Sequence, residues 1–233
     1  MGRFLMSPWK ELIQTKNLSL LGLRETLEGG QSFTWNATSA FSWIGSFESK
    51  VVELKFSEKI IFWRTSLVHQ AEESQVLDYL WLDQSYEDAI DNLPWRSDLV
   101  LAQCIKSIPG LTILNQPLEE MLFYFLLSSA KSIPQIKEAG YLVCKNYGVS
   151  LGKDLWGFPG WKKLADIEEE ELRKLKLGYR AKYVHQVAQE LRNDSEFLPR
   201  VLNADYENAH SLLTSLPGVG PKIADCTLLF GGK

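Results

Sequence analysis

The chain has 233 residues, a formal net charge of −4 and 45% apolar residues, a balance typical of an ordinary folded globule. This charge argues against a strongly basic nucleic-acid coat, and no apolar run approaches the length of a membrane span. Residues 1–10 also lack the apolar core of a signal peptide. Cys104, Cys144 and Cys226 are an odd, scattered set without a C-x-x-C pair. We therefore expect a reducing compartment, and neither a disulfide framework nor a cysteine-zinc site.

A pattern of period two runs from Ser32 to Arg64. Apolar and charged side chains alternate over residues 52–56, and an apolar strand resumes over residues 60–63 after a short turn. Residues 41–47 predict a preceding strand, in which Gly45 is a candidate bulge. The segment predicts an antiparallel meander rich in aromatic residues.

After about His69 the apolar residues follow helical spacing instead. Helices are predicted over residues 71–82, 97–107, 117–129, 133–147, 168–177, 183–192 and 206–214, with further helices starting at Ser85 and Pro221. Residues 117–129 are apolar around most of the circumference and predict a central helix. The order predicts an α+β fold: an N-terminal antiparallel β-sheet domain with linking helices over residues 1–116, and an all-helical domain over residues 117–233.

Charge is segregated within the second domain. Acidic residues gather over residues 166–171, whereas residues 172–183 carry only basic charges, at Arg173, Lys174, Lys176, Arg180 and Lys182. Such a pattern is compatible with a solvated helix of mixed charge. It is equally compatible with a local patch that faces phosphate on a protein that avoids indiscriminate DNA binding.

The most informative segment is LPGVGPKIADC at residues 216–226, which predicts a tight glycine turn that opens a helix. Gly218 and Gly220 would let the backbone approach phosphate oxygens closely, and Pro221 suits the first helical position. Lys222 is unexpected there, because the positive end of the helix dipole disfavours a cation. That field favours the neutral amine, the nucleophilic form. A loop with an exposed lysine is the competing interpretation.

Several segments in order resemble one family. Residues 29–35 (GGQSFTW), 175–183 (LKLGYRAKY), 206–210 (YENAH) and 216–226 are similar to motifs of the helix-hairpin-helix DNA glycosylases of the 8-oxoguanine DNA glycosylase/AP lyase group. The resemblance implies an N-terminal sheet domain packed on a helical bundle. It also implies that a damaged base is flipped out of the duplex, because the glycosidic carbon is shielded inside the stack.

The resemblance assigns roles to matching residues. Lys222 would attack C1′, expel the base and form a Schiff base that permits β-elimination, while Gly30 would accept the N7 hydrogen of 8-oxoguanine through its carbonyl. Cys226 would lie against the flipped base, Tyr179 would wedge into the gap, and Arg180 would contact the orphaned opposite base. The resemblance gives phosphate contacts to the N–H groups of Gly218 and Gly220, and a possible alkali-metal site to the carbonyls of Thr214, Leu216 and Val219.

Each role has a structural alternative. Gly30 could be a turn glycine, Cys226 a small buried residue, and Tyr179 with Arg180 a surface aromatic beside a solvated arginine. Asp225 could pair with Lys222 or face solvent. We interpret His69, His185 and His210 as structural.

The family resemblance also implies a partner and a setting. The partner would be double-stranded DNA containing an oxidised purine, bound by a monomer without a cofactor or membrane contact. The protein would act in the cytoplasm and nucleoid of a bacterium or in a eukaryotic nucleus.

Two departures from the family pattern concern specificity and completeness. Ala130 and Gln135 stand where an asparagine and a second arginine would contact the orphaned cytosine, so we expect less than about tenfold discrimination for cytosine. The chain also stops before the family's aspartate and C-terminal aromatic helix. We therefore expect a truncated, catalytically crippled and poorly stable chain, with an uncovered apolar run over residues 227–230.

Two other functions remain open. A monofunctional glycosylase for alkylated bases would use an activated water, and Lys222 argues against it. A non-catalytic helix-hairpin-helix DNA-binding module would not need the segment over residues 30–35.

Overall fold

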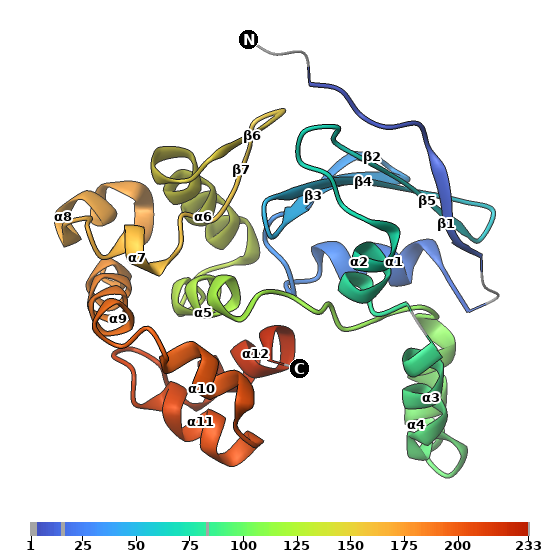
Figure 1. The fold of residues 1–233 in the computed structure, drawn as a ribbon. Helices are drawn as coiled ribbons and strands as arrows, with labels where there is room; N and C mark the ends of the chain where they lie inside the picture. The colour runs from blue at the N-terminus through green and yellow to red at the C-terminus, as the bar shows by residue number, and fades with distance from the viewer. Residues whose placement is uncertain (1–3, 15–16, 83, 233) are drawn as a thin grey trace. The chain divides into compact units, whose positions relative to one another are not determined.

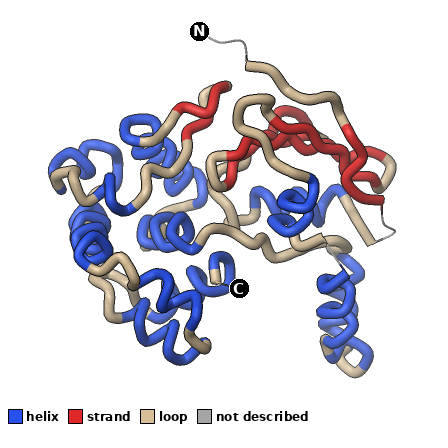
Figure 2. The backbone as a smooth tube through the Cα atoms, viewed as in Figure 1, coloured by secondary structure: helices blue, strands red, loops and turns tan. Residues whose placement is uncertain are grey.

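The computed structural model describes residues 4–14, 17–82 and 84–232. The chain forms two compact units, one of Met1–Ser46 with Lys50–Asn115 and the other of Phe47–Ser49 with Gln116–Lys233. Strands gather in the first unit and helices dominate the second (Figure 2). The predicted α+β class is confirmed. Within the described ranges, no helix is both long and apolar enough to cross a membrane.

The first unit is built on a five-stranded sheet with the order β1-β5-β4-β3-β2. The strands are β1 (Lys10–Gln14), β2 (Asn36–Ser39), β3 (Ser42–Phe47), β4 (Lys50–Ser57) and β5 (Ile60–Thr65). β1 and β4 both pair antiparallel with β5, and β2 pairs antiparallel with β3. The predicted meander is therefore confirmed. Helices α1 (Leu20–Glu28) and α2 (Glu73–Leu80) lie on one side of this sheet (Figure 1).

One detail of the sheet corrects the sequence-based expectation. The alternation of side chains predicts that Glu53 faces solvent, but Glu53 is buried. Its carboxylate forms an ion pair at 2.6 Å with Arg64, the residue opposite it in the β4–β5 pair, and this partner compensates the burial of its charge. The register shift of the β2–β3 pair falls between Ala37 and Ser39, and the bulge at Gly45 stays a prediction. A Cβ on Gly45 would lie 2.4 Å from the Trp35 ring, so glycine is required because the buried indole packs on this strand.

Three further helical segments complete the first unit: α3 (Gln84–Asn92), a 3-10 turn (Pro94–Arg96) and α4 (Leu99–Ser107). α4 is capped by Asp98, whose carboxylate accepts hydrogen bonds from the amides of Val100 and Leu101. α1 was not predicted, although the signals were present. Ser19 caps it by accepting from the Gly22 amide at 2.9 Å, and its buried leucines have helical spacing.

The second unit is organised around α5 (Leu118–Leu127), of which only Glu119 is not buried. This confirms the predicted central helix. The unit continues with α6 (Ile133–Tyr147), α7 (Trp161–Leu164), α8 (Glu169–Leu172), a π-helical turn (Arg173–Leu177), α9 (Arg180–Asn193), α10 (Phe197–Asn203), α11 (Tyr206–Thr214) and α12 (Pro221–Gly231). The expectation of an all-helical unit is wrong in one place, because β6 (Ser150–Gly152) and β7 (Leu155–Trp156) form a small hairpin.

α12 packs against α5 and so covers most of the run that was expected to be exposed. Phe230 stacks on Phe125 with ring centroids 5.7 Å apart, and Thr227 is fully buried. A Cβ on Gly231 would lie 2.9 Å from the Leu118 Cα, so this glycine lets the two helices approach closely. Of residues 227–230, only Leu229 is exposed. The expectation of an uncovered run is therefore corrected, because α5 supplies the cover within the same unit.

Candidate functional site

The turn between α11 and α12 forms the predicted hairpin. α11 ends at Thr214 as predicted, and the Val219 amide donates to the Leu216 carbonyl at 3.1 Å, while both side chains are buried. Gly218 has a φ of +80°, and a Cβ there would lie 2.4 Å from the ring of Tyr183. Glycine is therefore required at this position by backbone conformation and by packing together.

Gly220 differs from Gly218 because its surroundings are open. A Cβ built there would meet nothing within 4 Å, and Gly220 caps α12 without a side-chain hydrogen bond. Its carbonyl accepts from the Ala224 amide at 3.0 Å, as the first bond of the helix. The helix therefore begins with an accessible backbone, the arrangement that suits an anion at a helix N-terminus.

α12 presents Lys222 at its start and Cys226 one turn later. Lys222 is exposed, whereas Cys226 is partly buried. Burial raises the pKa of the Cys226 thiol, the nearby Asp225 carboxylate raises it further, and Lys222 opposes both. Cys226 is therefore a neutral thiol at neutral pH. The two side chains share one helix face, four residues apart.

Asp225 is exposed, as the second sequence-based alternative expected, but it also has partners on α11. Its carboxylate accepts a hydrogen bond from the Tyr206 hydroxyl at 2.8 Å and lies 3.4 Å from His210 Nε2. Asp225 therefore ties α12 to α11, and the interpretation of His210 as structural fits this contact. The hydrogen bond to Asp225 raises the pKa of Tyr206.

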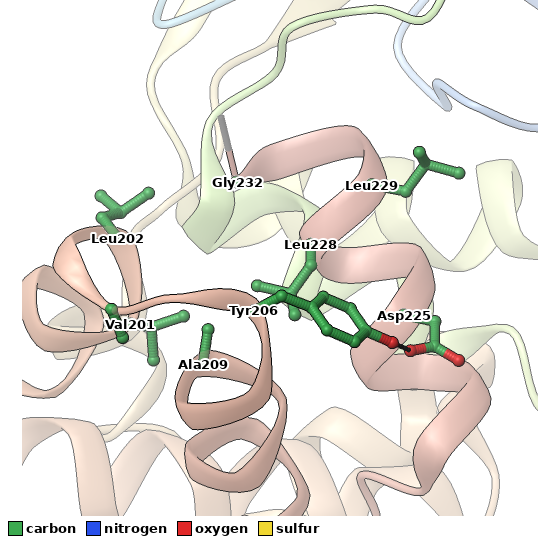
Figure 3. A pocket seen from close by; sticks show the side chains of 9 residues that line it. Val201, Leu202, Tyr206, Ala209, Asp225, Leu228, Leu229 and Gly232 are labelled. Carbon is green, nitrogen blue, oxygen red and sulfur yellow. Dashed lines mark hydrogen bonds between the residues drawn. The ribbon is translucent and has the colours of Figure 1, made fainter.

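The Tyr206–Asp225 pair borders a pocket of about 400 Å³ between α10, α11 and α12 (Figure 3). Most of its other lining residues are aliphatic, namely Val201, Leu202, Ala204, Ala209, Leu228 and Leu229, together with Gly232. Lys222 and Cys226 do not line it. The pocket and the predicted catalytic lysine are therefore separate features of α12.

A second glycine turn precedes α9. The predicted helix over residues 168–177 breaks at Leu175 and Lys176, where Lys176 has a φ of 64°, and Gly178 follows with φ 61° and ψ −137°. α9 then begins at Arg180, three residues earlier than predicted. The early start places Tyr179 at the turn and Arg180 in the first position of the helix.

Tyr179 and Arg180 have opposite exposures. Tyr179 is 52% exposed, whereas Arg180 is only 5% exposed. The Arg180 guanidinium carbon lies 4.3 Å from the centre of the Tyr179 ring, and Nη1 donates to the Leu177 carbonyl at 3.4 Å. Its buried Nε atom has no hydrogen-bond partner. The predicted contact between Arg180 and an orphaned base therefore requires this side chain to leave its position under Tyr179.

Most of the basic charge around this turn is paired. Arg173 forms an ion pair with Glu169, Lys174 pairs with Glu171 at 2.5 Å, and Lys176 pairs with Glu138. The acidic block at residues 166–171 thus neutralises part of the basic run that follows it. The interpretation as a solvated helix of mixed charge holds for Arg173 and Lys174.

The segment after α5 contains the two departures from the family pattern. Ala130 has a φ of 51°, a left-handed conformation that asparagine adopts more readily than alanine. The side chain of Gln135 caps its own helix: Oε1 accepts a hydrogen bond from the Ser132 amide at 2.9 Å in a capping box of α6. Between them, Lys131 Nζ donates to the Lys176 carbonyl at 2.7 Å. Sequence reasoning missed Lys131, and an isolated lysine in a polar loop offered no signal for it.

Gly30 lies in the first unit, directly after α1, with a φ of +101°. The following Gln31 anchors the turn, since its amide donates to the Thr112 carbonyl at 2.8 Å and its oxygen accepts from the Leu114 amide at 2.9 Å. Glycine is thus required by conformation, and its role toward a base remains a prediction.

The possible alkali-metal site stays untested. The Leu216 carbonyl of that set already accepts the Val219 amide. Among the residues that the structure describes, no cluster of three or more His, Cys, Asp or Glu side chains is arranged to hold a metal ion.

The chain is similar to known proteins in sequence and in fold. Residues 13–122 match the family described as 8-oxoguanine DNA glycosylase, N-terminal domain. The chain is 33% identical to N-glycosylase/DNA lyase of Saccharomyces cerevisiae over 92% of its length and 64% of the relative's. It is 30% identical to N-glycosylase/DNA lyase OGG1 of Arabidopsis thaliana, over 90% of this chain and 60% of that one. The chain therefore spans less than two thirds of these curated relatives.

A solved structure shows the same fold. The apo-form of Clostridium acetobutylicum 8-oxoguanine glycosylase/lyase superposes with a TM-score of 0.83 and 25% identity, over 97% of this chain and 80% of that one. The five-stranded sheet, the helical unit and the terminal hairpin define the helix-hairpin-helix DNA glycosylase class. Residues 13–122 thus match the N-terminal domain of 8-oxoguanine DNA glycosylases, and the whole chain is similar in sequence to N-glycosylase/DNA lyases and shares the fold of an 8-oxoguanine glycosylase/lyase.

Proposed function

We propose that the protein is a bifunctional DNA glycosylase/AP lyase that removes 8-oxoguanine from duplex DNA. The observation that carries the proposal is the exposed Lys222 in the first turn of α12, two residues after Gly220, whose surroundings are open. The names of the curated relatives, which are N-glycosylase/DNA lyases, support the same activity. Because the base must leave the stack before its glycosidic carbon can be reached, the reaction requires base flipping.

In the proposed reaction, the Lys222 amine attacks C1′ as the bond from C1′ to the purine nitrogen breaks, and the purine leaves with the bonding electrons and gains a proton. The nitrogen then loses its protons as the C1′–O4′ bond breaks and the sugar ring opens; one proton passes to O4′, which becomes a hydroxyl, the other passes to water, and an imine between Nζ and C1′ remains. Loss of the C2′ proton expels the 3′ phosphate by β-elimination. Water finally hydrolyses the imine and releases Lys222.

The other predicted residues would serve recognition. Gly30 would accept the N7 hydrogen that distinguishes 8-oxoguanine from guanine, and the neutral Cys226 thiol would contact the flipped base. The amides of Gly218 and Gly220 would bind phosphate on the strand that carries the lesion. Tyr179, whose ring is half exposed and supported by Arg180, would fill the vacated position in the stack.

Borohydride trapping tests the proposal. The chain is incubated with duplexes that contain either 8-oxoguanine or a preformed abasic site, and sodium borohydride reduces any imine to a stable covalent adduct. Because weak catalysis is expected of this chain, the incubations are long; we expect adducts with wild type on both duplexes, fewer of them on the 8-oxoguanine duplex, and none with Lys222→Gln. Lys163→Gln on α7 removes an exposed lysine elsewhere in the unit and serves as the matched control.

The two substrates separate the alternatives. An adduct with the abasic duplex alone would support the lyase step and contradict removal of 8-oxoguanine by this chain. An adduct that persists in Lys222→Gln would remove Lys222 from the nucleophile role. Binding without any adduct would favour the non-catalytic DNA-binding module.

A further inference from the structure

We propose that Lys131 is a DNA-contacting residue that binds a backbone phosphate of the duplex near Tyr179. The inference rests on the proposed function in one respect, namely that the ligand is DNA. It adds a residue for which the family motifs give no role, in the loop between α5 and α6.

The first support is the position of the ammonium group. Lys131 Nζ reaches from its loop to the Lys176 carbonyl at 2.7 Å, across to the turn that precedes α9. Ala130 and Lys176 on the two sides of this contact both have positive φ values, of 51° and 64°. The lysine is therefore held between two tight turns, and its position is defined better than that of a lysine extended into solvent.

The second support is the crowding of positive charge. Partial burial lowers the pKa of Lys131, the nearby charges of Arg180 and Lys176 lower it further, and Glu138 opposes them. Glu138 already forms an ion pair with Lys176. Clustered cations repel one another in the isolated protein, and a polyanion relieves that repulsion. An ammonium is a compact point charge and so suits a phosphate oxygen.

The third support is a chain of contacts that connects Lys131 to the hairpin. Gly218 packs against Tyr183, and Tyr183 meets Tyr179 edge-on with ring centroids 6.3 Å apart. Tyr179 in turn covers Arg180, which is one of the charges that act on Lys131. The hairpin and Lys131 are therefore both connected to the exposed Tyr179 ring through neighbouring side chains. Backbone contacts near a stacking aromatic ring are typical of proteins that bind an unstacked nucleotide.

The test measures DNA affinity and its salt dependence. A labelled duplex with a central tetrahydrofuran abasic-site analogue is titrated with the 233-residue chain by fluorescence anisotropy between about 50 and 200 mM salt. One lost phosphate contact reduces the slope of log K against log salt by about 0.9 and weakens binding about tenfold at 50 mM. We expect this result for Lys131→Met and not for the matched charge removal Lys163→Met.

Two further variants separate charge from local structure. Lys131→Arg keeps the charge and is expected to retain the wild-type slope. Lys131→Gln keeps a donor for the Lys176 carbonyl but loses the charge, and is expected to behave like Lys131→Met. A wild-type slope in Lys131→Gln would show that only the internal hydrogen bond matters and would overturn the proposal. Unchanged binding in a folded Lys131→Met variant would do the same.

A final arm distinguishes a phosphate from a base. The titrations are repeated with a duplex that has no base opposite the analogue. The effect of Lys131→Met should persist, and its disappearance would assign the contact to the opposite base and overturn the phosphate assignment. Because binding needs no Schiff base, this test and the trapping experiment fail independently. Borohydride adducts with unchanged Lys131→Met binding would reject only the inference about Lys131.

Discussion

Two glycine turns of the second unit, the one before α12 and the one before α9, differ in which side chains they bury and which they expose. The hairpin before α12 buries its apolar side chains, Leu216 and Val219, and leaves Lys222 exposed. The turn before α9 buries Arg180 and leaves the aromatic ring of Tyr179 exposed. The hairpin thus offers backbone amides and an amine, whereas the second turn offers a stacking surface. A glycine turn alone therefore does not define what a helix start presents to a ligand.

The largest effect is expected for Gly218→Ala, which places a Cβ 2.4 Å from the Tyr183 ring at a φ of +80°. Overpacking and backbone strain together should lower the free energy of unfolding by about 3–5 kcal/mol. Gly220→Ala is the control, because its Cβ meets nothing within 4 Å and its φ is −91°. Urea unfolding of both variants checks this difference. Equal losses would show that the two hairpin glycines do not differ.

The second prediction concerns Glu120 of α5, which is a buried ionisable side chain like Arg180. Burial raises its pKa to about 8, and the nearby Glu119 and Glu48 carboxylates contribute. The folded state therefore favours the protonated form. The resulting stability is full below the unfolded pKa, near 4.5, and is lost as the pH rises towards about 8.

Between pH 5.5 and 7.5 this linkage should lower the free energy of unfolding by about 2–3 kcal/mol. Glu120→Gln should remove most of that dependence. Urea titrations of wild type and variant at the two pH values measure it. A dependence that is the same in both proteins would assign the effect to other groups.

A smaller effect is expected for Gly178→Ala at the other turn. Gly178 has φ 61° and ψ −137°, which an alanine adopts only under strain, but the nearest atom to an added Cβ is Arg180 Nη1 at 3.9 Å. The loss should come from the backbone alone and amount to about 1–3 kcal/mol. Chemical unfolding of Gly178→Ala and Gly218→Ala under the same conditions compares the two losses in the free energy of unfolding. A loss as large as that of Gly218→Ala would mean that packing around Gly178 is tighter than its contacts indicate.

The smallest change in stability is expected for Arg180→Met. The variant loses a long hydrogen bond and the contact with the Tyr179 ring, but it also removes a buried Nε that has no partner. These contributions oppose each other, so the free energy of unfolding should change by less than about 1 kcal/mol. Affinity for the abasic-site duplex should still fall, because Tyr179 loses its support. A stability loss above about 3 kcal/mol would show that Arg180 is chiefly a structural residue.

Much of the fold followed from local patterns. The alternation in residues 52–56 and the apolar run over residues 60–63 predicted β4 and β5, and the apolar circumference of residues 117–129 predicted the central helix. α11 was predicted with its correct bounds. These segments succeed because the neighbours that decide their conformation are close in sequence. α1 and the β6–β7 hairpin were missed because short elements produce weak periodicity.

The candidate site was predictable only in part. The hairpin glycines and Lys222 belong to a contiguous motif, so their proximity was fixed by the sequence. The burial of Arg180, the use of Gln135 in a cap and the contact of Asp225 with Tyr206 all depend on partners elsewhere in the chain. No local pattern encodes such contacts.

The sequence by itself therefore determined the order of elements, the family and the position of a lysine at a helix start. Those properties depend on backbone preferences and on spacing within one segment. Only the tertiary structure decided which charges are exposed, because burial depends on what packs over a side chain. It covered the apolar face of α12 with α5, placed Arg180 beneath Tyr179, and brought Lys131 to the turn before α9.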